Sequence, residues 1–269
     1  MKARPLVRYH GGKWMLAPWI ISHFPPHRTY VEPFGGGGSV LLRKPRSYAE
    51  VYNDLDGEIV NLFTMARDRG EELAKLCELT PFSRTELSDS YTRSDNPLEQ
   101  ARRTLARSFM GFGSNSHSKV TGFRANSNRS GTTPSHDWMN YPDALRQTIQ
   151  RLRGIVIENR DALQCMQQHD APSTLHYADP PYVFSTRSDH KGDYPHEMTD
   201  SAHEELADGL KQLQGMVIVS GYRSDLYDAI YSDWRRIDRA AYADGAARRI
   251  ESLWFSPNTE AQQMELDVA

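Results

Sequence analysis

Short apolar runs alternate along the chain with longer stretches in which apolar residues recur every three or four positions. The short runs predict buried strands, and the longer stretches predict helices that bury one face. Strands are expected at residues 30–32, 51–53, 155–158, 175–178, 216–220, 235–239 and 251–255. Helices are expected at residues 13–24, 54–67, 71–79, 98–110, 137–153, 161–169, 200–214 and 224–231, with Asp54 as the cap of the second. Strands that alternate with helices predict an α/β fold with a largely parallel sheet covered on both faces.

A glycine-rich loop follows the first predicted strand. The segment EPFGGGGSV spans residues 32–40 and has apolar residues on both sides. Glycine allows the backbone to approach a ligand closely and to adopt positive φ. The spacing is not the dinucleotide fingerprint GxGxxG, and no lysine of a P-loop follows. A flexible Gly/Ser linker is the alternative interpretation of this segment.

An acidic residue, Asp54, directly follows the second predicted strand, some 20 residues after the glycine loop begins. An acid at this position is the expected partner of ribose hydroxyls in sheets that bind nucleotides. The glycine loop and Asp54 together therefore indicate a cofactor that contains a nucleoside, without a phosphate cradle.

The segment Asp179-Pro180-Pro181-Tyr182 follows a buried apolar run. Two prolines cannot continue a strand ladder, so the strand must end there. In an open α/β sheet, ligands bind at the carboxyl ends of the strands. The exocyclic amine of a nucleobase could donate to the Asp179 carboxylate and to the Pro180 carbonyl, while Tyr182 stacks on the base. The alternatives are a plain turn that ends a strand and a tyrosine packed under the sheet edge.

Four segments, in this order, resemble the Dam-type, D12-class DNA adenine-N6 methyltransferases of the alpha group. RYHGGKW at 8–14 is similar to the family's cofactor segment, and EPFGGGGSV follows at 32–40. IENRD at 157–161 resembles the segment whose acid contacts the adenine of the cofactor, and DPPY at 179–182 comes last. The resemblance extends over most of the chain.

The resemblance implies a Rossmann-like sheet that binds S-adenosylmethionine (SAM). It implies methyl transfer from SAM to the N6 amine of an adenine flipped out of double-stranded DNA at a specific site, with no metal. The implied catalytic residues are Asp179, Pro180, Pro181 and Tyr182. The implied cofactor contacts are Gly12, Lys13, Trp14, Glu32, Pro33, Phe34, Gly35, Gly36, Gly37, Ser39, Asp54 and Asp161. The enzyme could act with a restriction partner or alone.

A basic segment stands out in a chain whose net charge is −3. Residues 100–136 contain no Asp or Glu, and a one-sided basic stripe is typical of a surface that binds a phosphate backbone. We expect residues 70–140 to be an inserted, mostly helical target-recognition module within a catalytic domain of residues 1–69 and 141–269. The expected DNA contacts are Arg102, Arg103, Arg107, Lys119, Arg124, Asn126, Asn128 and Arg129. A solvated polar face is the alternative.

Other functions remain open at this point. Cytosine offers a similar amine, so N4-cytosine methylation is an alternative, and RNA could replace DNA as the substrate. A non-catalytic DNA-binding protein on the same scaffold is a further alternative, and a dinucleotide oxidoreductase would leave the DPPY segment unexplained.

Composition indicates a globular protein in a reducing compartment. The two cysteines, Cys77 and Cys165, form no metal-ligand pattern or disulfide framework. No apolar run reaches the length of a membrane span, and the first residues do not read as a signal peptide. We expect a cytoplasmic enzyme of a bacterial or phage-infected cell, acting as a monomer, with a dimer as the alternative.

Overall fold

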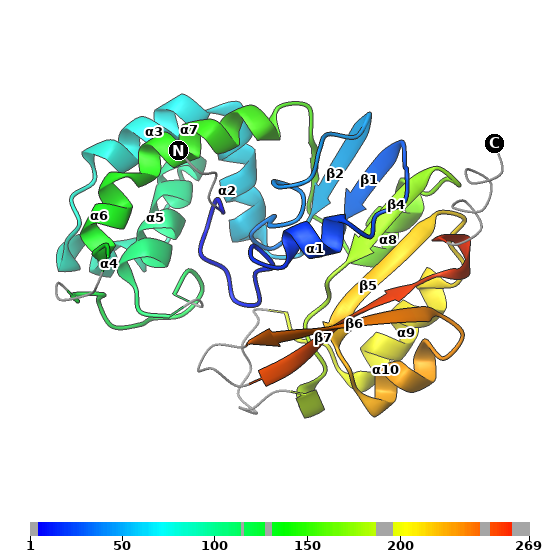
Figure 1. Ribbon diagram of the computed structural model, residues 1–269. Helices are drawn as coiled ribbons and strands as arrows, with labels where there is room; N and C mark the ends of the chain where they lie inside the picture. Colours follow the sequence, from blue (N-terminus) through cyan, green and yellow to red (C-terminus); the bar gives the residue numbers. More distant parts are fainter. Residues whose placement is uncertain (1–4, 114–115, 127–130, 187–195, 243–247, 260–269) are drawn as a thin grey trace. The chain divides into compact units, whose positions relative to one another are not determined.

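A computed structural model describes residues 5–113, 116–126, 131–186, 196–242 and 248–259 (Figure 1). The chain forms two compact units and passes between them several times. The helical unit comprises Met1–Met15, Gly36–Arg43 and Asp56–Ile157. The sheet unit comprises Leu16–Gly35, Lys44–Leu55 and Glu158–Ala269. The expected module of residues 70–140 falls within the helical unit, and its role in target recognition stays a prediction.

The sheet has seven strands in the order β3-β2-β1-β4-β5-β7-β6 (Figure 1). The strands are β1 (Thr29–Glu32), β2 (Ala49–Asn53), β3 (Val156–Glu158), β4 (Thr174–Ala178), β5 (Met216–Tyr222), β6 (Arg235–Tyr242) and β7 (Arg248–Phe255). Strand β1 pairs in parallel with β2 and β4, and β4 pairs in parallel with β5. Strand β7 runs antiparallel to both β5 and β6. The expected Rossmann-like, mostly parallel sheet is confirmed.

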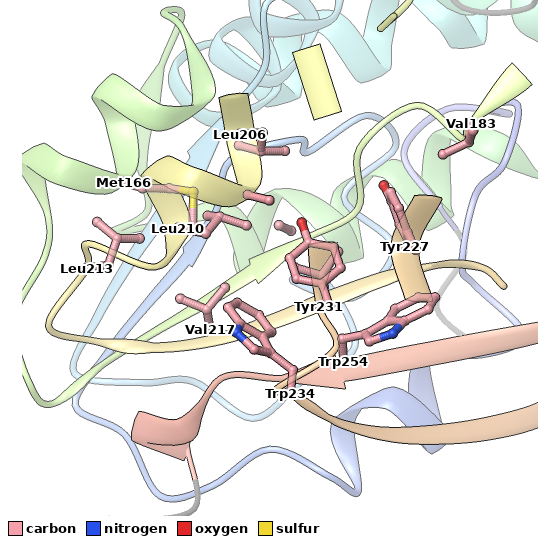
Figure 2. Packing of buried hydrophobic residues seen from close by; sticks show 13 residues of the cluster. Met166, Val183, Leu206, Leu210, Leu213, Val217, Tyr227, Tyr231, Trp234 and Trp254 are labelled. Atoms are coloured by element: carbon pink, nitrogen blue, oxygen red, sulfur yellow. The ribbon is translucent and has the colours of Figure 1, made fainter. Parts of the chain in front are cut away.

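Helices α1 (Ala17–Ile21), α8 (Ala162–Gln168), α9 (Asp200–Leu210) and α10 (Asp225–Ile230) belong to the sheet unit, as does a 3₁₀ turn at Phe184–Thr186. Figure 2 shows the core between α9, α10 and the strands, where Trp254 lies among aromatic side chains. Its ring is 5.1 Å from that of Tyr227 and 6.1 Å from that of Tyr231. This core fixes β5 and β7 beside each other.

The helical unit contains α2 (Gly57–Asp68), α3 (Gly70–Leu79), α4 (Arg84–Ser90), α5 (Pro97–Met110), α6 (Pro134–Met139) and α7 (Tyr141–Leu152). Helix α5 packs against α2, α3, α4 and α6, which explains why most of its residues are buried. Asn96 caps α5 by accepting from two backbone N–H groups at its start. No helix within the described ranges is long and apolar enough to span a membrane.

The structure corrects four expectations about helices. The helix expected at 13–24 covers only Ala17–Ile21. The cap of α2 is Asp56, whose carboxylate accepts from the Glu58 N–H at 2.9 Å, and not Asp54. The helix expected at 137–153 is two helices separated at Asn140, because Pro142 favours the first turn of a new helix. The polar helix α4 was not expected from the hydrophobic pattern.

Candidate active site

Strand β4 ends at Ala178, directly before the DPPY segment, as predicted from its two prolines. All five residues of β4 are buried, whereas Asp179 is half-buried. Ala178 pairs with Val219 of β5, so Asp179 comes beside the next residue of that strand, Ser220. The Ser220 hydroxyl donates to Asp179 Oδ1 at 2.8 Å. The carboxylate therefore has a fixed neighbour at the carboxyl edge of the sheet.

Tyr182 is tied to the last strand of the chain. Its hydroxyl donates to both carboxylate oxygens of Glu251, at 2.8 and 3.1 Å, and Glu251 is buried on β7. Tyr222 pairs opposite Glu251 in the sheet, and its ring lies 4.4 Å from the ring of Tyr182. Only 7% of Tyr182 is exposed. Stacking on a base therefore stays a prediction, and packing beneath the sheet edge remains its alternative.

Glu32 lies at the end of β1, next to a tyrosine on the same strand face. The Tyr30 hydroxyl donates to Glu32 Oε2 at 2.7 Å, and both residues are buried. Burial, reinforced by the Glu32 charge, raises the pKa of Tyr30 well above its ordinary value. The phenol therefore keeps its proton at neutral pH and remains a donor to Glu32.

Asn53, the last residue of β2, brings three chain segments together. Its side-chain amide donates to the carbonyls of Pro33 and Arg160, at 2.8 and 3.0 Å, and its Oδ1 accepts from the Arg160 N–H at 3.0 Å. Close by, the Asn159 amide donates to the Asp54 carbonyl at 2.7 Å. The segments that carry two predicted cofactor acids, at 54 and 161, thus meet at one edge of the sheet.

The two acids have different local environments. Asp54 directly follows β2, as predicted, and is half-buried. Asp161 is exposed and caps α8, with Oδ1 accepting from the Gln164 N–H at 3.1 Å. Both carboxylates are of the type that accepts from hydroxyl and amine groups. The proposed contacts of Asp54 with ribose and of Asp161 with adenine stay predictions.

Packing against aromatic rings explains why two residues of the glycine loop lack side chains. A Cβ atom on Gly35 would lie 2.2 Å from a ring carbon of Tyr52 within the sheet unit. Within the helical unit, Gly36 has φ +47° and a Cβ there would lie 2.8 Å from the ring of Tyr9. The glycines are thus required by the fold, whether or not a ligand approaches them.

The other predicted cofactor residues lie in the helical unit or near the aromatic core. Gly12 lies against Ser39, because a Cβ on Gly12 would be 3.6 Å from the serine Oγ. Lys13 is buried and donates to the Gly11 carbonyl at 3.2 Å. The Arg43 guanidinium lies over the Trp14 ring, with its central carbon 5.1 Å from the ring centre. In the sheet unit, Phe34 packs against the core shown in Figure 2.

Three of the predicted DNA-binding arginines are engaged with groups of their own unit. Arg102 and Arg103 both bind Glu99, at 2.7 and 2.8 Å, and hydrogen bonds from Arg102 hold the pKa of Glu99 down at about 2. Arg107 is buried; it donates to the carbonyls of Ser90 and His117 at 2.6 and 2.9 Å and binds Glu58. Their contact with DNA stays a prediction.

The remaining predicted DNA contacts follow α5. Lys119 and Asn126 are exposed, and Arg124 is half-buried with its guanidinium 3.2 Å from the Phe109 carbonyl. A β-bridge pairs Gly111 with Phe123, which stand on either side of Lys119 in the sequence. Asn128 and Arg129 lie outside the described residues.

Sequence reasoning did not identify two residues that contact the DPPY segment. They are Ser220 on β5, which contacts Asp179, and Glu251 on β7, which contacts Tyr182. The signal for Glu251 was a charged residue at the start of a predicted strand that ends in three apolar residues, because buried carboxylates need partners.

The two cysteines are poorly suited to nucleophilic catalysis. Burial raises the pKa of the Cys77 and Cys165 thiols to about 12, so neither is a ready nucleophile at neutral pH. No group of three or more His, Cys, Asp or Glu side chains suited to a metal ion occurs in the part of the chain that the structure describes.

Comparisons with known proteins agree with the family resemblance. The profile of the family described as D12 class N6 adenine-specific DNA methyltransferase matches residues 9–243. A Type II methyltransferase of Lactococcus lactis subsp. cremoris is 25% identical over 253 residues, which cover 86% of this chain and 85% of that protein. A DNA adenine methylase of Escherichia coli is 22% identical over 259 residues, 92% of each chain. A DNA adenine methylase of Serratia marcescens is 29% identical over 94 residues, 35% of this chain and 32% of that protein.

Proposed function

Because the chain belongs to the D12 class of N6 adenine-specific DNA methyltransferases, we propose that it transfers the methyl group of SAM to an adenine flipped out of double-stranded DNA. The observation that carries this proposal is the Asp179 carboxylate, held by Ser220 at the carboxyl end of β4 and followed by two prolines. Ligands bind at that edge of an α/β sheet, where the Asp179 carboxylate and the Pro180 backbone carbonyl can both accept hydrogen bonds from a planar amine.

The amine of adenine is a poor nucleophile, since its lone pair is delocalised into the ring. Asp179 accepts one N–H and the Pro180 carbonyl accepts the other, which orients the nitrogen and draws it toward tetrahedral geometry. Pro181 keeps the turn rigid, because its φ is fixed. Tyr182 stacks on the flipped base and recovers part of the cost of unstacking. Catalysis comes mainly from positioning and from dipoles that are already oriented.

When bound, SAM would supply an electrophilic methyl group from its sulfonium to the amine nitrogen, and the amine would give up one proton to solvent. The acidic residues at the sheet edge are suited to bind the adenosine part of SAM. Asp54 accepts from the ribose hydroxyls and Asp161 from the adenine amine, on segments that Asn53 and Asn159 join. We assign the remaining cofactor contacts to Gly12, Lys13, Trp14, Glu32, Pro33, Phe34, Gly35, Gly36, Gly37 and Ser39.

We assign DNA binding to the basic segment of the helical unit. Lys119 and Asn126 are exposed, and Arg124 lies near them in sequence. Arg102, Arg103 and Arg107 are also assigned to DNA phosphates. They would make these contacts while Arg102 and Arg103 bind Glu99, Arg102 binds Glu86 and Arg107 binds Glu58. We further propose that the enzyme acts as a monomer and meets DNA in the cytoplasm.

The test is methyl transfer from SAM to unmethylated genomic DNA, followed by digestion to nucleosides and mass spectrometry. Asp179→Ala is the matched variant, and SAM binding and thermal melting are measured for both proteins. We expect N6-methyladenine from the wild type, and from Asp179→Ala intact folding and SAM binding without methyl transfer. An active Asp179→Ala enzyme would contradict the catalytic assignment. A variant that no longer folds would favour a structural role for the carboxylate.

A further inference from the structure

Two buried hydroxyls lie in series behind the Asp179 carboxylate. The Ser220 Oγ is 2.8 Å from Asp179 Oδ1, and the Tyr177 hydroxyl is 2.9 Å from the Ser220 Oγ. Tyr177 is on β4, two residues before Asp179, and Ser220 is on the neighbouring strand β5. Both hydroxyl-bearing residues are fully buried within the sheet unit. The carboxylate is therefore linked through these hydroxyls to residues of two neighbouring strands.

The direction of these hydrogen bonds follows from the number of protons. A carboxylate can only accept, so Ser220 donates its single proton to Asp179. Tyr177 must then donate to Ser220, whose oxygen still has lone pairs. Burial, followed by the nearby Asp179 charge, raises the pKa of Tyr177 well above its ordinary value. The phenol therefore stays protonated at neutral pH and keeps this direction of donation.

We propose that Ser220, oriented by Tyr177, is a positioning residue that fixes the rotation of the Asp179 carboxylate toward the target amine. The proposal rests on the proposed function, since it requires Asp179 to accept from that amine. A carboxylate with a partner at one oxygen loses freedom to rotate about its Cβ–Cγ bond. The Asp179 lone pairs that accept from the substrate amine then keep one direction before the substrate binds. Residues that hold a catalytic group in its productive orientation increase the rate in this way.

The same sheet contains a matched control for this contact. Ser252 is also fully buried, and its hydroxyl donates to Asp238 Oδ1 at 2.8 Å. It lies on β7, and Asp238 lies opposite it on β6. Ser252→Ala thus removes the same type of hydrogen bond, of the same length, from an aspartate outside the DPPY segment. Any effect that Ser220→Ala has beyond Ser252→Ala reports on Asp179.

The experiment measures kcat and KM for SAM and for DNA, together with thermal melting, in the wild type and in four variants. The variants are Ser220→Ala, Ser252→Ala, Tyr177→Phe and the double variant Ser220→Ala/Tyr177→Phe. A hydrogen bond to a charged group, at the lower end of its usual strength, predicts a loss of about tenfold in kcat for Ser220→Ala, with KM for SAM within about twofold. We expect a loss of about two- to fivefold for Tyr177→Phe and no further loss in the double variant, since both act through one contact.

A Ser220→Ala enzyme with the kcat of Ser252→Ala would overturn the positioning role, and an inactive Asp179→Ala enzyme beside it would leave the proposed function intact. An active Asp179→Ala enzyme would instead remove the proposed function and the positioning role together. If Ser220→Ala fails to fold, Ser220→Cys nearly preserves the volume with a much weaker donor. A folded Ser220→Cys enzyme with wild-type kcat would equally overturn the proposal, whereas a tenfold loss would support it.

Discussion

The hydroxyl of Tyr182 donates to the carboxylate of Glu251, a residue 69 positions further along the chain. The two meet because β7 lies antiparallel beside β5 and places Glu251 opposite Tyr222, against which the ring of Tyr182 packs. The bond holds Tyr182 by the polar tip of its ring. Loss of the hydroxyl and loss of the whole ring should therefore have separable effects on stability and on methyl transfer.

Tyr182→Phe should keep most of the methyl-transfer activity and lose stability. The ring remains for stacking, but buried Glu251 loses this donor, at a cost of about 1–3 kcal/mol in the free energy of unfolding. Tyr182→Ala should lower kcat/KM by about 5- to 150-fold, because base stacking contributes about 1–3 kcal/mol. Initial rates with labelled SAM and urea unfolding curves measure the two effects.

Tyr231→Phe serves as the control for loss of a phenol, since Tyr231 is buried in the core shown in Figure 2. It should leave kcat/KM unchanged. Equal activities of Tyr182→Phe and Tyr182→Ala would show that stacking is not the role of Tyr182, and that it packs beneath the sheet edge.

Gly35→Ala should destabilise the protein even though it adds one methyl group. The new Cβ would lie 2.2 Å from the ring of Tyr52, which is fully buried and cannot swing into solvent. Overpacking of this kind costs about 1–3 kcal/mol. Gly122→Ala is the control, because nothing lies within 4 Å of a Cβ there. Thermal melting compares the two, and equal melting temperatures would contradict the close packing of Tyr52.

The free energy of unfolding should fall as the pH is lowered from about 6.5 to about 4. Burial lowers the pKa of His176 to about 4, although its hydrogen bond with Asp170 opposes the shift. Above pH 6.5, the imidazole is neutral in both the folded and the unfolded state. Between the two pKa values only the unfolded chain takes up the proton, which lowers the stability by on the order of 3 kcal/mol.

Urea unfolding of the wild type and of His176→Leu, between pH 4 and pH 8, measures this dependence. The variant is less stable overall, but its stability should vary less with pH in this range. An identical slope in both proteins would assign the pH dependence to other groups, such as His27, whose pKa burial also lowers.

Lys119→Gln should weaken DNA binding in a salt-dependent manner. Lys119 is exposed, and loss of one phosphate contact reduces the slope of log affinity against log salt by about one. Arg107→Met should instead reduce stability by about 3 kcal/mol, because it removes the donors to Ser90, His117 and Glu58. Fluorescence anisotropy of a labelled duplex at several salt concentrations, together with thermal melting, separates the two cases.

An unchanged salt slope for Lys119→Gln would contradict its role at a phosphate. A reduced slope for Arg107→Met with normal melting would show that Arg107 leaves its internal partners to bind DNA.

Local sequence was sufficient for features that depend on neighbouring residues. The two prolines after Ala178 end β4 by their own geometry, and Asp54 follows β2 as its spacing predicts. The choice between Asp54 and Asp56 as the cap of α2 was not predictable, since both are aspartates within one turn. Backbone geometry decides it, because the Asp56 carboxylate reaches the Glu58 N–H.

Contacts between residues far apart along the chain could not be predicted from the sequence. Tyr182 and Glu251 meet only because β7 inserts between β5 and β6, an order that no local pattern specifies. The acidic partners of the basic segment also come from outside it: the segment itself has no acids, yet Arg102 binds Glu99, one residue before it, and Arg107 binds Glu58 of α2.

The strand order β5-β7-β6 also bears on how the enzyme is made on the ribosome. Strand β6 is synthesised before β7, but in the sheet it pairs with β7, which separates it from β5. Glu251 leaves the ribosome some 70 residues after Tyr182, at translation speeds of about 5–20 residues per second. Asp179 and the two hydroxyl-bearing residues behind it, Tyr177 and Ser220, are therefore all synthesised before Glu251. Tyr182 gains the partner of its hydroxyl only several seconds after it has itself been synthesised.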